Sequence, residues 1–305
     1  MKEAFVHIGA HKAASSFLRA NLTLHKDRLM EEHGLCLVTR ATIMPSAFGQ
    51  EVYEVSQRRH PETAVTDAAK ESLRSLLSNC DDNILISNED LICHLPIQDF
   101  YQNAESSIRY LRTALSGFDL HIIFYIRKQA DYIESIYMQF VHLGRRAKFA
   151  PFMERAAPID LSWLRAVEDM ERALPPGRLH LRAFEQIRQL GEDGFYRDFL
   201  SLCGVRDVEN FKIHEEYSKG RAANRSYGQL GMQIAQRVNP LLRTRKERRM
   251  LRRFLQENFS TATHPRAVLL DETQRQAIFE KYQESNRRLF ERYDLGLRDE
   301  SLGYF

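Results

Sequence analysis

Short apolar runs alternate with stretches of helical periodicity along the first two-thirds of the chain. Runs of strand length occur at Ala4–Ile8, Leu35–Val38, Ile84–Ser87, Leu120–Ile126 and Arg178–Leu181. Apolar residues at helical spacing lie between them, at Ser15–Glu32, Thr66–Leu77, Ala104–Leu115 and 128–143. Strands separated by helices predict an α/β fold, in which a parallel sheet is covered by helices on both faces.

One of these runs predicts a central strand. Leu120–Ile126 shows no alternation of apolar and polar residues, as expected for a strand that is buried on both faces. Residues 41–62 are predicted to form a loop, because they contain Pro45, Gly49 and Pro61.

The last third of the chain is predicted to be helical. Helical patterns occupy 192–202, 224–238, 245–259 and 272–292, and no linker rich in Pro, Gly or Ser precedes them. We therefore expect a single domain of residues 1–305. In it, an α/β core of residues 1–190 is capped by a helical part, residues 191–305.

Composition indicates a soluble globular protein. Of its 305 residues 43% are hydrophobic and 28% are charged, and the formal net charge of +3 argues against nucleic-acid binding. No apolar run is long enough for a signal peptide or a membrane span. Cys36, Cys80, Cys93 and Cys203 form no C-x-x-C pair, so neither a zinc site nor a disulfide framework is expected. We expect buried, reduced thiols and a cytoplasmic location.

The segment from Phe5 to Leu18 predicts an anion site. Its apolar run ends at Gly9, and Lys12, Ser15 and Ser16 follow before a helical pattern begins. The first backbone N–H groups of a helix have no intrahelical partner, and the helix dipole adds partial positive charge there. The loop differs from a Walker A motif, which has a second Gly before an adjacent Lys and Ser or Thr. The alternative is an ordinary strand–helix turn with an exposed lysine.

A second strand-to-helix junction follows the predicted central strand. Arg127 stands at the end of that strand, where ligands of open parallel sheets bind, and Ser135 follows eight residues later. The planar guanidinium can donate two parallel hydrogen bonds to a phosphate. Alone, this segment also fits a solvent-facing helix start. Two such sites on one sheet suit a nucleotide with phosphates at both ends of its ribose.

In these two segments the chain resembles the sulfotransferases that use 3′-phosphoadenosine 5′-phosphosulfate (PAPS), in particular the bacterial carbohydrate-type branch. The 5′-phosphosulfate loop of that family is similar to Gly9–Lys12 with Ser15 and Ser16, and its 3′-phosphate motif is similar to Arg127 with Ser135. Weaker similarities extend over most of the chain. The loop departs from the family at Ala13 and Ala14, where a Thr-Gly-like pair is usual; an alanine has less access than glycine to positive φ.

The resemblance implies a P-loop-like three-layer fold and transfer of a sulfuryl group from PAPS to a hydroxyl of a carbohydrate or small metabolite, without a metal. Lys12 is then expected to neutralise the leaving phosphate of the product PAP. Ser15 and Ser16, with the backbone of Gly9, Ala13 and Ala14, are expected to hold the 5′-phosphate. Arg127 and Ser135 are expected to hold the 3′-phosphate and so to distinguish PAPS from ATP.

A general base is needed for the acceptor hydroxyl. Glu89 directly follows a predicted strand and is the first candidate, with His11 and His94 as alternatives. His7 lies within a strand, where a buried core histidine is expected, and Asp90 is interpreted as a helix cap.

Residues 243–253 are strongly basic, and apolar residues at helical spacing accompany them, at Met250, Leu251, Phe254, Leu255 and Phe259. Such a helix packs its apolar stripe and presents cations outward. It is a solvated face, or it contacts an anionic glycan acceptor or an acidic membrane surface. Lys219–Arg221 is a candidate for a late basic loop that closes over the nucleotide.

Two other functions remain open. Ala13 and Ala14 are compatible with a non-catalytic relative that binds a nucleotide or polyanion, and a kinase-like phosphotransferase is disfavoured by the missing G-K-[ST] sequence. The acceptor and the oligomeric state cannot be predicted from these patterns.

Overall fold

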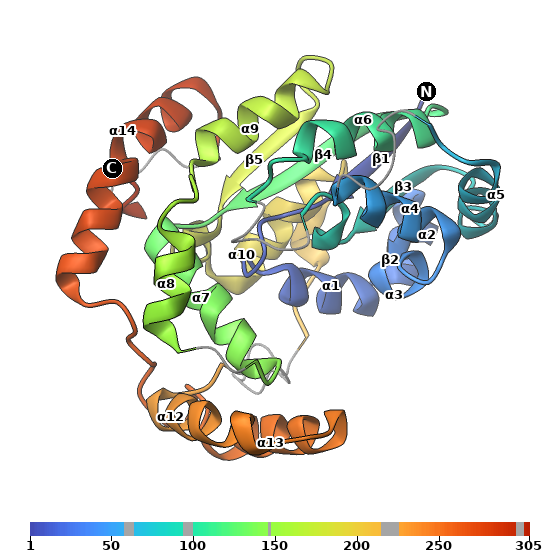
Figure 1. Ribbon diagram of the computed structural model, residues 1–305. Helices are drawn as coiled ribbons and strands as arrows, with labels where there is room; N and C mark the ends of the chain where they lie inside the picture. Colours follow the sequence, from blue (N-terminus) through green and yellow to red (C-terminus); the bar gives the residue numbers. More distant parts are fainter. Residues whose placement is uncertain (58–63, 94–99, 146–147, 215–225, 297–301) are drawn as a thin grey trace. The chain divides into compact units, whose positions relative to one another are not determined.

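The computed structural model describes residues 1–305 except 58–63, 94–99, 146–147, 215–225 and 297–301 (Figure 1). The chain forms two compact units: the first comprises residues 1–127, 162–214 and 283–305, and the second comprises residues 128–161 and 215–282. These units interleave along the chain and do not follow the expected division near residue 190. The single-domain organisation with a helical cap stays a prediction.

A five-stranded parallel sheet forms the centre of the first unit, in the order β2-β3-β1-β4-β5. Its strands are β1 Lys2–His7, β2 Leu35–Thr39, β3 Asn83–Ser87, β4 Phe118–Ile126 and β5 Leu179–Ala183. Val6 of β1 lies opposite Ile86 of β3 on one side and Ile122 of β4 on the other. All side chains from Leu120 to Ile126 are buried, so the predicted α/β class and its central strand are confirmed.

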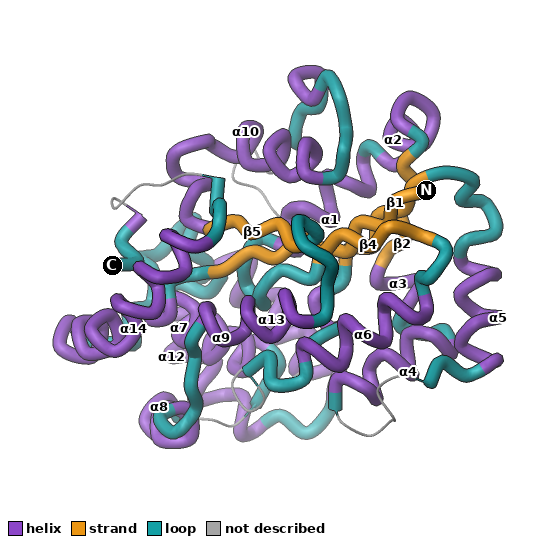
Figure 2. The backbone as a smooth tube through the Cα atoms, turned by 90° about the horizontal axis from the view of Figure 1, so that it is seen from above, coloured by secondary structure: helices purple, strands orange, loops and turns teal. Residues whose placement is uncertain are grey.

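Helices cover both faces of this sheet, as predicted. The helices of the first unit are α1 Ser15–Leu24, α2 Lys26–His33, α3 Arg40–Ile43, α4 Ala47–Ser56, α5 Asp67–Leu76, η1 Glu89–Leu91, α6 Ala104–Ala114, α9 Trp163–Arg172, η2 Phe184–Gln186, α10 Ile187–Leu202 and η3 Val208–Asn210. Figure 2 shows the strands between α1, α2 and α10 on one side and α4, α6 and α9 on the other. The predicted helix Ser15–Glu32 is divided at His25, between α1 and α2.

The prediction of a loop at residues 41–62 is wrong for much of the described part, because α4 occupies Ala47–Ser56. Ser46 caps this helix by accepting a hydrogen bond from the Gly49 N–H at 3.0 Å. The apolar residues of one face are buried, namely Phe48, Val52 and Val55. Gly49 serves close packing, since a Cβ there would lie 2.0 Å from the carbonyl oxygen of Ile43. Gly49 therefore contributed wrongly to the prediction of a loop.

Two of the four cysteines are joined in a disulfide, which contradicts the expectation of reduced thiols for this pair. Cys36 in β2 and Cys80 before β3 are bonded, with their Cα atoms 5.4 Å apart. They are 44 residues apart in sequence, and the pairing of β2 with β3 brings them together. Cys93 and Cys203 are buried, as expected.

The second unit consists of helices in its described part, apart from connecting segments and the isolated bridges of Tyr227 with Ser260 and of Gly228 with Arg266. Its helices are α7 Gln129–His142, α8 Phe149–Ala156, α12 Gln229–Val238, η4 Asn239–Leu241, α13 Arg245–Asn258 and the first turns of α14 Glu272–Arg292. Helices α8 and α9 were not predicted, whereas the patterns at 245–259 and 272–292 are confirmed. No helix in these described ranges combines the length and the apolar character that crossing a membrane requires.

Hydrogen bonds hold α7 and α12 together. Gln236 Nε2 donates to the hydroxyl of Tyr137 at 2.7 Å, and Asn239 Nδ2 donates to the carbonyl oxygen of Val141 at 2.8 Å. Helix α13 begins with a capping box formed by Thr244 and Glu247, and it packs on α12.

Candidate functional site

The carboxyl ends of β1 and β4 lie where the chain connections of the sheet reverse direction. These strands are neighbours, but β1 leads to β2 at one edge of the sheet and β4 leads to β5 at the other. Ligands of open parallel sheets bind at such a point, because the loops diverge and leave a crevice. Lys12 and Arg127 follow these two strands.

The loop between β1 and α1 is anchored on β4. The N–H groups of Ile8 and Ala10 donate to the carbonyl oxygens of Ile123 and Tyr125 at 3.1 and 2.8 Å, which extends the strand pairing into the loop. The Ala13 N–H donates to the Ala10 carbonyl at 3.0 Å. The Ala13 amide, predicted to bind the 5′-phosphate, is thus engaged in shaping the loop.

Two residues of this loop adopt the left-handed conformation, Lys12 with φ 69° and Ala14 with φ 63°. Ala14 is the N-cap residue of α1, and its side chain offers no acceptor to the first-turn N–H groups. The hydroxyl Oγ of Ser15 is buried and has no hydrogen-bond partner among the described residues, whereas Ser16 is exposed. An uncapped helix N-terminus beside a buried, unpaired hydroxyl can bind a phosphate.

Replacing Ala14 with glycine is expected to raise the free energy of unfolding by up to about 1 kcal/mol, because an L-residue in the left-handed region is strained by roughly 1–2 kcal/mol. The matched control is Ala13→Gly, at a buried neighbour without positive φ, which should lower stability by about 0.5–1 kcal/mol. Urea denaturation of both variants measures the two effects. Equal losses of stability in both would contradict a strained Ala14.

Arg127 contacts the loop directly. Its Nη1 donates to the carbonyl oxygen of Lys12 at 2.5 Å, and its guanidinium carbon lies 4.8 Å from the ring centre of Phe184. The indole Nε1 of Trp163 donates to the Arg127 carbonyl at 2.7 Å. The structure therefore brings together the two basic residues that the sequence singled out.

Ser135, the other predicted 3′-phosphate ligand, belongs to the second unit. It is buried in α7, which begins two residues after Arg127. The preceding residue, Glu134, is fully buried and accepts hydrogen bonds from the N–H groups of Leu269 and Leu270 at 2.8 and 2.9 Å. Arg275 also pairs with Glu134, so this part of α7 is fixed within its own unit.

Glu89 lies at the end of β3, in η1, and is paired with Arg19 of α1. Arg19 Nη2 donates to Glu89 Oε1 at 3.2 Å, and Arg19 Nη1 contacts Oε2. Burial favours the neutral acid, but the Arg19 guanidinium, with a smaller effect of His11, outweighs it and lowers the pKa of Glu89 below its usual 4.5. The carboxyl is therefore ionised at neutral pH and is a weak base.

His11 in the loop is bonded to Asp90 in η1. His11 Nε2 and Asp90 Oδ1 are 3.1 Å apart, and Arg40 Nε donates to Asp90 Oδ2 at 2.8 Å. Burial opposes ionisation of Asp90, but His11 and Arg40 together hold its pKa well below the usual 3.8. Asp90 is not the helix cap that the sequence suggested; Asn88 is the cap and accepts from the Asp90 N–H at 3.1 Å.

His7 is a buried core residue, as predicted. Its Nδ1 lies 2.9 Å from Ser87 Oγ, and burial lowers the pKa of His7 to about 3. Its ring also explains Gly9, since a Cβ at that position would lie 2.7 Å from His7 Nε2. Gly9 thus lets the loop pass close to the imidazole.

Asp90, Arg40 and Arg19 are site residues that sequence reasoning missed or misassigned. Each acts through a partner at least 50 positions away, and no local spacing signals such a contact. Two predicted groups, His94 and Lys219–Arg221, lie outside the described residues.

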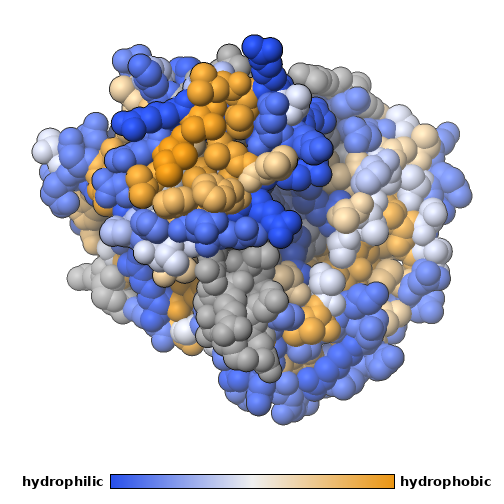
Figure 3. Space-filling model, turned by 90° about the horizontal axis from the view of Figure 1, so that it is seen from below, coloured by the Kyte–Doolittle hydropathy of each residue, from blue (hydrophilic) through white to orange (hydrophobic). Residues whose placement is uncertain are grey.

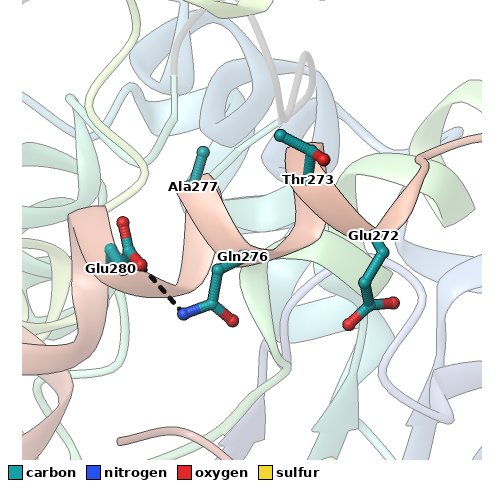
Figure 4. A pocket seen from close by; sticks show the side chains of 5 residues that line it. All are labelled: Glu272, Thr273, Gln276, Ala277 and Glu280. Atoms are coloured by element: carbon teal, nitrogen blue, oxygen red, sulfur yellow. Dashed lines mark hydrogen bonds between the residues drawn. The ribbon is translucent and has the colours of Figure 1, made fainter.

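A cavity of about 460 Å³ lies along the first turns of α14, in the second unit. Among the described residues its lining comes from α14, at Glu272, Thr273, Gln276, Ala277 and Glu280 (Figure 4). Gln276 Nε2 donates to Glu280 Oε1 at 2.9 Å. Two carboxylates would repel a phosphate, so this cavity does not suit the predicted nucleotide.

No protein-family model matches the chain, and no curated protein matches it significantly. Among solved structures, it is similar to the crystal structure of a sulfotransferase from Alicyclobacillus acidocaldarius. The two are 15% identical with a TM-score of 0.43, over 82% of this chain and 99% of that chain. A likeness at this level carries no conclusion about the reaction, which must be inferred from the site residues themselves.

Proposed function

We propose that this chain is a PAPS-dependent sulfotransferase that acts on a hydroxyl of a carbohydrate or another small metabolite. The observation that carries this proposal is the junction of Lys12 and Arg127. The hydrogen bond of 2.5 Å from Arg127 Nη1 to the Lys12 carbonyl joins the two segments that resemble the family's phosphate motifs. The junction lies between neighbouring strands, where the sheet connections reverse.

The residues around this junction fit a nucleotide with two separate phosphates. Lys12, the N-terminus of α1 and the buried Ser15 hydroxyl supply positive charge and donors for the 5′-phosphate. Arg127 is the cation for the 3′-phosphate, and the role of Ser135 stays a prediction from the sequence.

The reaction is an in-line transfer of the sulfuryl group. The acceptor oxygen forms a bond to sulfur while the bond between sulfur and the 5′-phosphate oxygen breaks, and PAP leaves with the negative charge. The proton of the acceptor hydroxyl passes to a base. Because the transition state of such transfers is loose, the protein mainly positions the reactants and stabilises charge. We assign to Lys12 the stabilisation of the negative charge on the leaving phosphate.

We assign the general base to His11 rather than to Glu89. The bond to Asp90 makes Nε2 the protonated nitrogen, and this assignment leaves Nδ1 as the acceptor. Nδ1 is buried and has no hydrogen-bond partner in the described part of the chain. Glu89, by contrast, is ion-paired with Arg19 and its pKa is lowered, which weakens it as a base.

Binding of PAP and transfer of label from PAPS test the function. We expect PAP to raise the unfolding midpoint while ATP with Mg²⁺ does not, and labelled sulfate to reach an acceptor from a panel of carbohydrates and small alcohols. A stronger response to ATP with Mg²⁺ would favour the kinase-like alternative. Binding of PAP without transfer to any acceptor or to water would favour the non-catalytic relative, which the strained Ala14 motivates.

Replacing Arg127 with lysine is expected to weaken PAP binding at least 10-fold, because an ammonium loses the two-pronged contact with a phosphate. Binding of AMP, which lacks the 3′-phosphate, should change less than 3-fold. AMP thus serves as the control for damage to the loop through the lost contact with Lys12. Titration calorimetry with both nucleotides makes the comparison, and equal losses for the two would remove Arg127 from 3′-phosphate recognition.

The cytoplasmic location is part of the same proposal. The Cys36–Cys80 disulfide removes the argument from reduced thiols, since stable disulfides are rare in the cytoplasm.

A further inference from the structure

The positive charge of this chain is concentrated in and just before α13. Residues 243–253 contain seven Arg and Lys residues and one Glu, whereas the net charge of all 305 residues is +3. The rest of the chain is therefore net negative. The one acid, Glu247, is used in the capping box, where it accepts from the N–H groups of Arg243 and Thr244 at 2.7 and 2.9 Å.

Large apolar side chains are exposed beside these cations. Leu241 in η4 is 75% exposed, Met250 and Phe254 in α13 are 63% and 51% exposed, and Leu230 in α12 is 42% exposed. Met250 and Phe254 are four residues apart and share a face of α13. Figure 3 shows a contiguous hydrophobic patch bordered by strongly hydrophilic side chains, viewed from the side on which Figure 1 draws α12 and α13. We call these four residues and the cations of 243–253 the basic–apolar face.

The basic–apolar face is built on a fixed support. Leu255 of α13 is fully buried, α13 packs on α12, and α12 is bonded to α7 through Gln236 and Tyr137. The helices that carry the exposed apolar side chains are therefore well packed, so this exposure does not result from a loosely packed helix. Exposed apolar groups of this size, bordered by charge, mark contact surfaces.

We propose that the basic–apolar face docks the protein on the surface of an anionic lipid bilayer. A helix that combines a Lys- and Arg-rich flank with Phe, Met and Leu lies in the interface, where cations meet headgroups and apolar groups enter the acyl boundary. Each Lys or Arg near an anionic surface strengthens such binding about fivefold. An acidic glycan would cover the cations but not the apolar side chains, and a second copy of the chain would bring like charges together.

The occupant is thus a membrane surface, contacted without a spanning helix. This inference does not depend on sulfuryl transfer, because docking is measured without PAPS. It bears on the proposed reaction in one way: an enzyme held at a membrane meets acceptors that carry a lipid.

Sedimentation of the full chain with vesicles tests the docking. We expect binding to vesicles of phosphatidylcholine with about 30% phosphatidylglycerol, little binding to pure phosphatidylcholine, and weaker binding as salt rises, since exposed charges are screened. Lack of binding to the anionic vesicles at low salt would overturn the proposal.

Paired variants separate the apolar and the charged contributions to vesicle binding. The double variant Met250→Gln with Phe254→Gln keeps good helix formers and should weaken vesicle binding at least 10-fold. Leu24→Gln, at a side chain 51% exposed in α1, is the matched control and should change binding less than 2-fold. Unfolding midpoints of all variants verify the fold.

The charged contribution is tested by a second variant and its matched control. Lys246→Glu with Arg249→Glu should weaken binding to anionic vesicles at least 10-fold, whereas Lys26→Glu with Lys70→Glu, at exposed positions elsewhere, should change it less than 3-fold. Dextran sulfate tests the alternative of a polyanion site. If the Met250 and Phe254 substitutions change neither tight binding to dextran sulfate nor binding to vesicles, membrane docking is overturned in favour of that site.

Discussion

Replacing Lys12 with alanine is expected to lower kcat for sulfuryl transfer about 10²- to 10³-fold, the usual cost of removing one preorganised group that faces developing charge. Lys12 is the full positive charge of the loop after β1, beside the N-terminus of α1. The leaving phosphate gains charge as its bond to sulfur breaks, so the loss should appear mainly in kcat. Transfer of label from saturating PAPS to a saturating acceptor measures it.

Backbone strain at Lys12 requires controls. Its φ is 69°, so a substitution could act through the loop conformation and not through the amine. Lys12→Gly removes the amine and relieves the strain, and it should be as inactive as the alanine variant. Lys12→Arg keeps the charge and should retain more activity than either. Lys70→Ala, at an exposed lysine of α5, should have the wild-type rate.

Activity in Lys12→Gly within threefold of wild type would show that the loop shape, and not the amine, is what the site requires. The same result would remove the main support for Lys12 as the group that neutralises the leaving phosphate. The PAP-induced rise in unfolding midpoint, measured for each variant, distinguishes lost binding from lost turnover.

The sequence was sufficient for features that are encoded locally. The β4 run could be placed because seven consecutive buried residues leave no alternation, and Arg127 follows directly from where that run ends. The loop from Gly9 to Ser16 could be placed because it joins a strand to a helix within a few residues. The parallel sheet follows from the order of these elements along the chain.

Features made by distant partners could not be predicted in this way. The disulfide of Cys36 and Cys80 depends on the pairing of β2 with β3, and the role of Asp90 depends on His11 and Arg40. At α4 the local signal itself misled, because Gly49 is required by the nearby Ile43 carbonyl and not by a turn. Sequence periodicity predicts the secondary structure of a single element. The disulfide, Asp90 and Gly49 are explained only by the residues of other segments that contact them.

Replacing His11 with alanine is expected to lower kcat about 10²- to 10⁴-fold, the range of general acid–base catalysis, while PAP affinity stays within threefold. The reason is the position of its two nitrogens: Nε2 is held by Asp90 at 3.1 Å, and Nδ1 is the acceptor for the proton. Kinetics with saturating PAPS and calorimetry with PAP measure the two quantities. A variant with normal kcat would contradict His11 as the base.

Asp90 is expected to act as a positioning residue for His11. Asp90→Asn keeps the size of the side chain but can present an N–H to His11, so we expect kcat to fall about 10-fold or more with little change in KM. Arg40→Ala is the matched control, since it removes the other partner of Asp90 and leaves the contact with His11. A similar loss of kcat in both variants would indicate a structural role for the cluster.

The pH dependence of kcat separates His11 from Glu89. The pKa of Glu89 is lowered below 4.5, so as a base it would stay deprotonated, and kcat would be constant, from pH 8 down to about pH 5. A fall of kcat within that interval would therefore not come from Glu89 as the base. We expect Glu89→Gln to keep the wild-type profile, because the carboxylate is ion-paired with Arg19. A flat wild-type profile over the interval, with Glu89→Gln inactive, would assign the base to the carboxylate.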